Sequence, residues 1–292
     1  MNRIKGILYA AVSSSTFGLA PFFSITLLLA VFSAFEVLSY RWGVASIVLI
    51  VFGWLSGCNF RLAGKDWGVV FLLSLLRAVT SFSLIIAYQN IASGVASTIH
   101  FMYPLAVALA MMFFFREKKS LLVILAVLMS LLGAALLSLG ELEAKSGNTM
   151  VGLVAACVSV FSYAGYIVGV RTTRVVQINS TALTCYVMGL GTIFYLIGAY
   201  CTSGLQLVSD GYTWLIILGL ALPATAISNI TLVQAIKYAG PTLTSILGAM
   251  EPLTAVVIGV FVFKELFTVN SAVGIILILL AVSIVVFRRQ KS

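Results

Sequence analysis

The chain has 292 residues, of which 62% are hydrophobic and only 9% charged, and its mean hydropathy is +1.16. A soluble domain of this length cannot bury so much apolar surface, so the composition indicates an integral membrane protein. The net charge of +9 would suit a nucleic-acid-binding protein, but the basic residues are scattered between apolar segments. We therefore expect no nucleic-acid partner, and attribute the positive charge to membrane topology.

Polar connections divide the chain into ten apolar segments, each close to the roughly 20 residues that cross a hydrocarbon core of about 30 Å. We expect helices over residues 5–28, 33–55, 67–88, 94–115, 119–139, 149–170, 179–202, 211–236, 241–263 and 269–287. Arg3 and Lys5 precede the first segment, as in a signal peptide, but the apolar stretch runs past Pro21 without a small-residue cleavage site. We expect it to be the first spanning helix.

The basic residues predict the orientation of these helices. If the N-terminus is cytoplasmic, the inner side carries Arg3, Lys5, Arg61, Lys65, Arg116, Lys118, Lys119, Arg171, Arg174, Lys237, Arg288, Arg289 and Lys291. The outer side then carries only Lys145 and Lys264. Because cytoplasmic connections hold the excess of Lys and Arg, we expect both termini to be cytoplasmic.

The chain contains an internal repeat. An offset of 148 residues places "FMYPLAV" over "AMEPLTA", so that Pro104 meets Pro252, and an offset of 146 places "GILYAAVSS" over "GLVAACVSV". We interpret the chain as two five-helix copies, residues 1–145 and 146–292. An odd number of spans turns the second copy upside down, which is the inverted-repeat plan of many secondary transporters.

These features resemble the drug/metabolite transporter superfamily, specifically its ten-helix EamA-domain members, over nearly the whole chain. The resemblance rests on the proline-centred fourth and ninth helices, which end at Glu117 and Glu265, and on "SYRWGVAS" around Arg41; "MEPLTAVVIG" is the closest stretch. It implies a bacterial-type inner-membrane carrier of a small metabolite, with a central cavity between the repeats. It favours export over import. The superfamily serves amino acids, nucleotide precursors, vitamins, sugars and toxic compounds, so membership names no substrate.

Ionisable residues within the spans are the strongest functional signal. Arg41, Arg77, His100 and Glu251 lie inside expected helices, and none recurs at the matching position of the other copy. A charge at the bilayer centre costs about 2.5–3.5 kcal/mol on insertion scales, so such residues are usually functional. We expect a polarised cavity in which Glu251 faces Arg77 or Arg41. The alternative is a structural ion pair between Arg41 and Glu251, since the resemblance includes both, whereas Arg77 and His100 depart from the family pattern and suit substrate choice.

A polar stripe on the third expected helix supports the cavity. Its members are Arg77, Ser81, Leu84 and Tyr88. Spacings of four, three and four residues place them on one helix face. The candidate substrate-binding residues are Arg77, Arg41, His100, Glu251, Tyr103, Ser81, Tyr88 and Asn229.

Pro104 and Pro252 are candidate hinges or gates in the fourth and ninth helices. Proline lacks an N–H and strains the preceding helical turn, which frees carbonyls that a cavity can use. A kink with a purely structural role is the alternative interpretation.

The motifs argue against an enzyme. The chain has one histidine and no HExxH, GxSxG or phosphate-binding glycine loop. Its four cysteines lie singly without CxxC spacing, so we expect no disulfide, no metal site and no cofactor. The sequence therefore favours a secondary transporter of a small metabolite, an amino acid or another carboxylate, with protons as the candidate coupling ion. The alternative is a passive channel or facilitator for small polar solutes.

Overall fold

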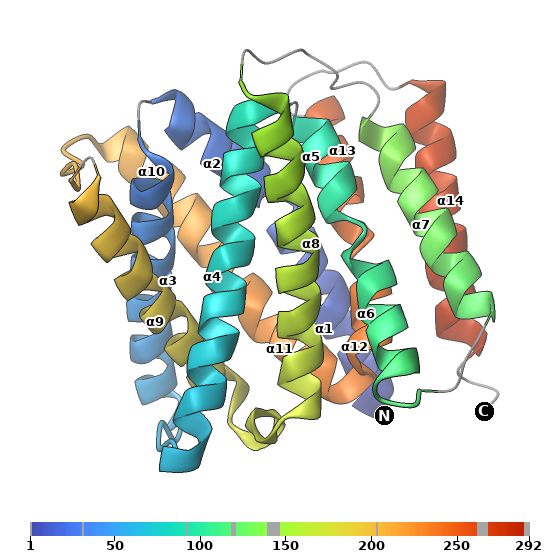
Figure 1. Ribbon diagram of the computed structural model, residues 1–292, viewed down its shortest axis with the longest axis horizontal. Helices are drawn as coiled ribbons and strands as arrows, with labels where there is room; N and C mark the ends of the chain where they lie inside the picture. Colours follow the sequence, from blue (N-terminus) through green and yellow to red (C-terminus); the bar gives the residue numbers. More distant parts are fainter. Residues whose placement is uncertain are drawn as a thin grey trace.

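A computed structural model describes residues 2–30, 32–91, 93–117, 121–138, 147–202, 204–261 and 268–288. The helices of these residues run side by side in one bundle, with no strand among them (Figure 1). The helices are α1 (Asn2–Phe17), α2 (Ala20–Leu29), α3 (Ala34–Leu55), α4 (Trp67–Asn90), α5 (Ser93–His100), α6 (Tyr103–Phe113), α7 (Leu121–Ser138), α8 (Thr149–Thr172), α9 (Ser180–Cys201), α10 (Gly211–Ala221), α11 (Ser228–Ala239), α12 (Pro241–Leu247), α13 (Met250–Phe261) and α14 (Val269–Arg288). The 3₁₀ turns η1 (Gly64–Asp66) and η3 (Arg174–Gln177) and the π-helical segment η4 (Leu222–Ile227) complete the set.

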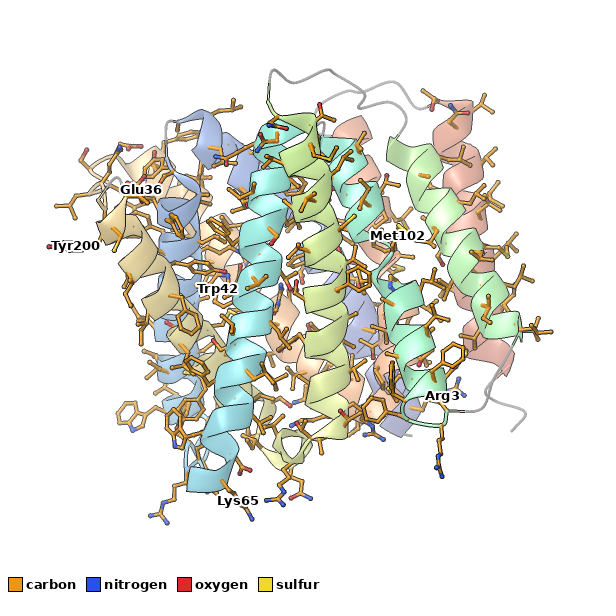
Figure 2. All side chains as sticks on the ribbon, in the orientation of Figure 1. Arg3, Glu36, Trp42, Lys65, Met102 and Tyr200 are labelled. Carbon is orange, nitrogen blue, oxygen red and sulfur yellow. The ribbon has the colours of Figure 1, made fainter. Side chains whose placement is uncertain are left out.

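The ten expected helices are present, each within three residues of its predicted limits where the structure describes it. By length and composition, seven continuous or broken helices among the described residues can cross a membrane, and two shorter apolar helices accompany them at Leu121–Gly133 and Ala272–Ile284. Large apolar side chains are exposed on the outer faces of the bundle, as lipid contact requires (Figure 2). The prediction of an all-α membrane protein is confirmed.

Four of the ten spans are interrupted, and each interruption lies beside a proline. The helix pairs α1/α2, α5/α6 and α12/α13 are separated by two-residue breaks, and the second helix of each pair has Pro21, Pro104 or Pro252 in its first turn. Proline suits the first turn because its missing N–H has no helical partner there. Pro223 lies in η4, between α10 and α11. The breaks therefore precede Pro104 and Pro252 rather than coincide with them.

The helix packing has a two-fold pattern. Helix α1, the first span, packs on α11 of the eighth, and α8, the sixth, packs on α4, the third. Exchanging the two copies converts one of these pairs into the other. Two further pairs, α3 with α9 and α7 with α14, map onto themselves under the same exchange. Helix α1 starts at the lower edge of Figure 1 and its counterpart α8 at the upper edge, so the copies are inverted.

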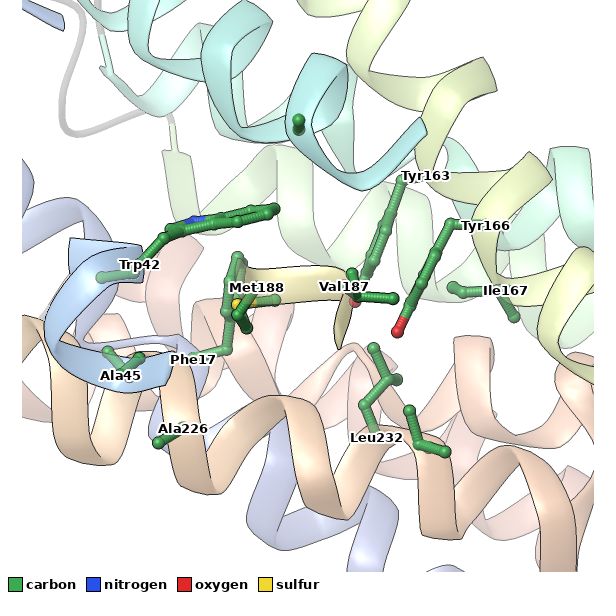
Figure 3. Close-up of a cluster of buried hydrophobic side chains, with 14 of the residues drawn as sticks. Phe17, Trp42, Ala45, Tyr163, Tyr166, Ile167, Val187, Met188, Ala226 and Leu232 are labelled. Atoms are coloured by element: carbon green, nitrogen blue, oxygen red, sulfur yellow. The ribbon is translucent and has the colours of Figure 1, made fainter. Parts of the chain in front are cut away.

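The two copies contact each other through bulky side chains that pack against glycines. Trp42 of α3 is fully buried and packs edge-on against Tyr195 of α9, with ring centroids 5.1 Å apart. A Cβ atom at Gly191 of α9 would lie 2.1 Å from the Trp42 ring, so only glycine fits there. Figure 3 shows Trp42 in the buried cluster that also contains Phe17, Tyr163 and Tyr166. This core holds the helices that carry the central polar residues.

Hydrogen-bonding side chains begin several helices. Ser33 and Glu36 form a reciprocal capping box at the start of α3, and Asn148 and Asn179 cap α8 and α9. Asp210 caps α10 outside the spanning segments, and the hydrogen bond from the Thr213 N–H lowers the pKa of its carboxyl group.

Candidate functional site

A cavity inside the bundle contains both arginines of the spans. Arg41 of α3 and Arg77 of α4 are 4% and 1% exposed, and both line a small cavity of about 10 Å³, which has room for about one water molecule. As the stripe predicts, Ser81, Leu84 and Tyr88 line the same cavity from α4. Phe17, at the end of α1, also lines it. All of its lining residues belong to the first repeat, whereas the expected cavity lay between the two repeats.

Arg77 is held by neutral partners. Its Nε–H donates to Asn229 Oδ1 at 3.1 Å, and Nη1 lies 3.4 Å from Ser81 Oγ. The guanidinium carbon lies 4.9 Å from the ring centroid of Tyr163 and 5.4 Å from that of Phe17. Both distances are within the range of cation–π attraction. These contacts orient the guanidinium group and leave its charge uncancelled.

Asn229 is itself fixed by the π-helical segment. Its Nδ2 donates to the Thr225 carbonyl oxygen at 2.7 Å, so its Oδ1 is the atom turned toward Arg77. Asn229 belongs to α11 and Arg77 to α4, which are the eighth and third spans. The predicted residues Arg77, Ser81 and Asn229 are therefore brought together across the two repeats.

Arg41 binds the same segment through a residue that the sequence analysis missed. Its Nε–H donates to Thr225 Oγ1 at 2.7 Å, while the Thr225 hydroxyl donates to the Leu220 carbonyl oxygen, also at 2.7 Å. Arg41 Nη2 lies 3.5 Å from the Ala224 carbonyl oxygen. A π-helix and a nearby proline both release carbonyls from the usual helical pattern. Pro223, two residues before Thr225, was the available signal.

Glu251 lies in the first turn of α13 and keeps part of its surface accessible. It lies close enough to Arg77 and Arg41 for an electrostatic interaction, but it is not among the residues that line the cavity. Within the described part of the chain, neither arginine forms an ion pair with it, because their bonds go to Asn229, Ser81, Thr225 and Ala224. The alternative of a direct structural pair between Arg41 and Glu251 is not present in this conformation.

His100 ends α5 and bonds a serine of α8. Ser159 Oγ lies 2.8 Å from His100 Nδ1 and 2.6 Å from the Ala156 carbonyl oxygen. The tautomer of the imidazole decides whether Nδ1 donates to or accepts from the Ser159 hydroxyl. Nε2 is buried and has no hydrogen-bond partner among the described residues. The imidazole also stacks on Tyr163, with ring centroids 5.4 Å apart. The same Tyr163 ring contacts the guanidinium group of Arg77.

Tyr103 joins the breaks of the fourth and ninth spans. It begins α6, and a Cβ atom built at Gly248 would lie 1.8 Å from its Oη. Its ring lies 4.6 Å from that of Tyr163 in an edge-on contact. Tyr88, in contrast, lies toward the end of α4, where its Oη is 3.3 Å from Ser97 Oγ. Arg77, Tyr163 and Tyr103 thus form a continuous series of contacts, whereas Tyr88 shares only the cavity lining with Arg77.

Comparisons with known proteins agree with this architecture. A family model described as the EamA-like transporter family matches residues 4–139 and again residues 150–287. Among solved structures 29 chains match, and one titled "Crystal structure of protein" has a TM-score of 0.80 at 18% identity, covering 100% of this chain and 99% of its own. A likeness at that identity shows the fold alone. The comparison with curated proteins found no match.

Proposed function

Because the chain belongs to the EamA-like transporter family, which matches it in both repeats, we propose that it is a secondary transporter that moves a small metabolite by alternating access. The single observation that carries the proposal is the pair of buried arginines between the repeats. Arg77 lies near the middle of α4, at the depth where carriers of this plan bind their substrates. Neither Arg41 nor Arg77 has an ion-pair partner in the described residues, so a bound ligand is the natural one.

The proposed substrate carries a carboxylate, as an amino acid or another small organic acid does. A guanidinium group donates two parallel hydrogen bonds to a carboxylate and stays charged when buried. The proposed binding residues are the eight that the sequence analysis selected: Arg77, Arg41, His100, Glu251, Tyr103, Ser81, Tyr88 and Asn229. The contacts of Arg77 with Asn229 and Ser81 support this set.

Alternating access is supported by a difference between the two ends of the bundle: one contains the cavity and the other is closed. The cavity is lined by α2 and the second half of α4, which lie away from the edge where the chain starts (Figure 1). At that starting edge the two repeats are in direct contact. Thr242 donates to Glu117 Oε2 at 2.6 Å. Gly6 packs closely against Ala239, because a Cβ atom added at Gly6 would lie 2.7 Å from the Ala239 backbone nitrogen. Transport requires these contacts to open, with the breaks before Pro104 and Pro252 as the hinges.

Further proposals follow from the sequence and the family. The repeats comprise residues 1–145 and 146–292, and both termini lie in the cytoplasm of a cell whose inner membrane holds the protein. Arg3 and Lys65 lie on the same side of the bundle, away from Glu36, which supports the orientation (Figure 2). The proposed direction is export. Glu251 is the proposed proton site, because among the described acidic residues it alone interacts electrostatically with both arginines.

A passive channel is the rival function, and the closed half argues against it. A channel needs a continuous pore, whereas Tyr103 on Gly248 and Thr242 on Glu117 close the path toward the starting edge of the chain. The family membership supports transport rather than catalysis.

A metabolite screen tests the proposal. Cells that overproduce the wild-type chain are compared with cells that overproduce Arg77→Ala at equal membrane levels. We expect the concentrations of a small set of carboxylates to change, inside the cells and in the medium, only in cells that overproduce the wild type. Identical profiles in the two strains would contradict the assignment of Arg77 to the site.

A further inference from the structure

We infer that the central site selects a ligand with a net negative charge over a zwitterion or a cation of the same carbon skeleton. This inference rests on the proposed function, and specifies the charge of the substrate that the site accepts. It follows from a count of the charges in the spans and from the partners of each charge.

The spans contain more fixed positive than negative charge. Arg41 and Arg77 lie within helices and contribute one positive charge each. Among the described residues, four of the five acidic ones lie in connections, at helix ends or in a first turn away from the arginines: Glu36, Asp66, Glu117 and Asp210. In the sequence, Glu141, Glu143 and Glu265 fall between the expected helices. Glu251 is the exception. The cavity region therefore has an excess of one positive charge when Glu251 is ionised, and of two when it is protonated.

The neutral partners of the arginines do not remove this excess. Asn229, Ser81 and Thr225 contribute dipoles, and the Phe17 and Tyr163 rings contribute weak cation–π attraction. An uncompensated charge in a low-dielectric interior is costly. A bound anion supplies the missing charge.

An amino acid fits the same site less well. Its carboxylate would pair with Arg77 and its ammonium group with Glu251, which leaves Arg41 with only Thr225 and the Ala224 carbonyl. The net charge of the region would be unchanged by such a ligand. The corresponding 2-oxo acid has the same skeleton and no ammonium group, so it neutralises the excess and avoids repulsion from the second arginine.

Binding of matched ligands to the purified full-length protein tests the inference. The probes are three skeletons, those of alanine, leucine and phenylalanine, each offered as the 2-oxo acid, the amino acid and the amino-acid amide. Thermal stabilisation in detergent and equilibrium binding are measured at one ionic strength. For at least one skeleton we expect the 2-oxo acid to bind about tenfold or more tightly than the zwitterion, since one charge contact of about 1.4 kcal/mol gives that ratio.

Two substitutions that change charge with little change of shape provide the internal control. Glu251→Gln removes a negative charge and is expected to increase the preference for the anion. Asn229→Asp places a negative charge next to Arg77 and is expected to abolish the preference for the anion. The matched control is Asn59→Asp, at an exposed residue outside the spans that accepts a hydrogen bond from the Arg61 N–H, and it should leave the ratio unchanged.

Equal or tighter binding of the zwitterions would overturn the inference, as would binding of none of the probes. A ratio that fails to move in opposite directions in Glu251→Gln and Asn229→Asp, both eluting as folded protein, would also overturn it. Failure of the proposed function has a different signature: the anions bind with the expected charge dependence, but liposomes containing the protein do not take them up. If the metabolite screen instead identifies zwitterions as substrates, the transport function stands and the charge inference fails.

Discussion

The Nε–H group of Arg77 donates to Asn229 Oδ1 across 3.1 Å, which joins the third span of one repeat to the eighth span of the other. These two spans are counterparts in the internal repeat, yet they carry different residues at matching positions. An offset of 147 residues places Ala224 opposite Arg77, and the Ala224 carbonyl oxygen accepts from Arg41. The inverted fold is therefore symmetric in its helices and asymmetric in its central chemistry, so one wall supplies guanidinium groups and the other their acceptors.

Arg77→Lys is expected to retain insertion and folding and to lose most transport of a carboxylate. Lysine keeps the charge but lacks the planar fork that donates to Asn229 and to a carboxylate together. Loss of one charge-assisted hydrogen bond, about 1.5–3 kcal/mol, corresponds to a fall of about tenfold or more in apparent affinity. Uptake kinetics and elution from a size-exclusion column measure the two effects. If both Arg77→Lys and Arg77→Ala transport as the wild type does, Arg77 has only a packing role.

Gly248→Ala is expected to destabilise the protein by about 1–3 kcal/mol, because its Cβ atom would overlap Tyr103 Oη at 1.8 Å. Thermal unfolding in detergent measures the change. Gly189→Ala, at a helical glycine with nothing within 4 Å of the new atom, is the matched control and should be neutral. Adding Tyr103→Phe removes the overlapping oxygen and should restore part of the loss; no recovery would show that the Tyr103 contact is not the cause.

The sequence predicted the helices well, and four of the eight candidate site residues line the cavity: Arg41, Arg77, Ser81 and Tyr88. The other four candidates, His100, Tyr103, Asn229 and Glu251, are not among its lining residues. Ten apolar segments, the inverted repeat and the stripe through Arg77 follow from local spacing. The acceptor of Arg41 does not, since Thr225 reaches it only after η4 widens the helix and turns the hydroxyl inward. Tyr163 was missed for a similar reason: an aromatic residue in an apolar span has no distinguishing pattern until Arg77 packs on its ring.

Thr225→Val tests the π-helical acceptor with a side chain of the same shape. It leaves the Arg41 Nε–H without its 2.7 Å partner, so we expect a loss of about 1–3 kcal/mol of stability. Thr231→Val is the control, because the Thr231 hydroxyl bonds only carbonyls of its own helix, those of Ile227 and Ser228. Thermal unfolding of the two variants should differ clearly. Equal stability would mean that Arg41 finds another acceptor.

The orientation can be tested at two glycines with open space around them, Gly64 and Gly211. In a variant lacking the four native cysteines, Gly64→Cys is expected to be inaccessible to an impermeant thiol reagent added to intact cells. Gly211→Cys is expected to react. The reason is the excess of basic residues on the side of Gly64, which favours the cytoplasm. Labelling of Gly64→Cys alone would show that the orientation is inverted.

Counterflow in liposomes tests the central claim, that the site around the two buried arginines is exposed to one side of the membrane at a time. Liposomes containing the purified protein are loaded with an excess of the substrate identified by the metabolite screen and diluted into a trace of the labelled compound. We expect the label to accumulate transiently inside the liposomes above its external concentration. Each time the site carries unlabelled substrate outward, it can bind labelled substrate and return facing inward. Glu251→Gln should retain this exchange and lose accumulation driven by a proton gradient. A label that only approaches its external concentration, with loaded and empty liposomes alike, would contradict alternating access and indicate a passive pore.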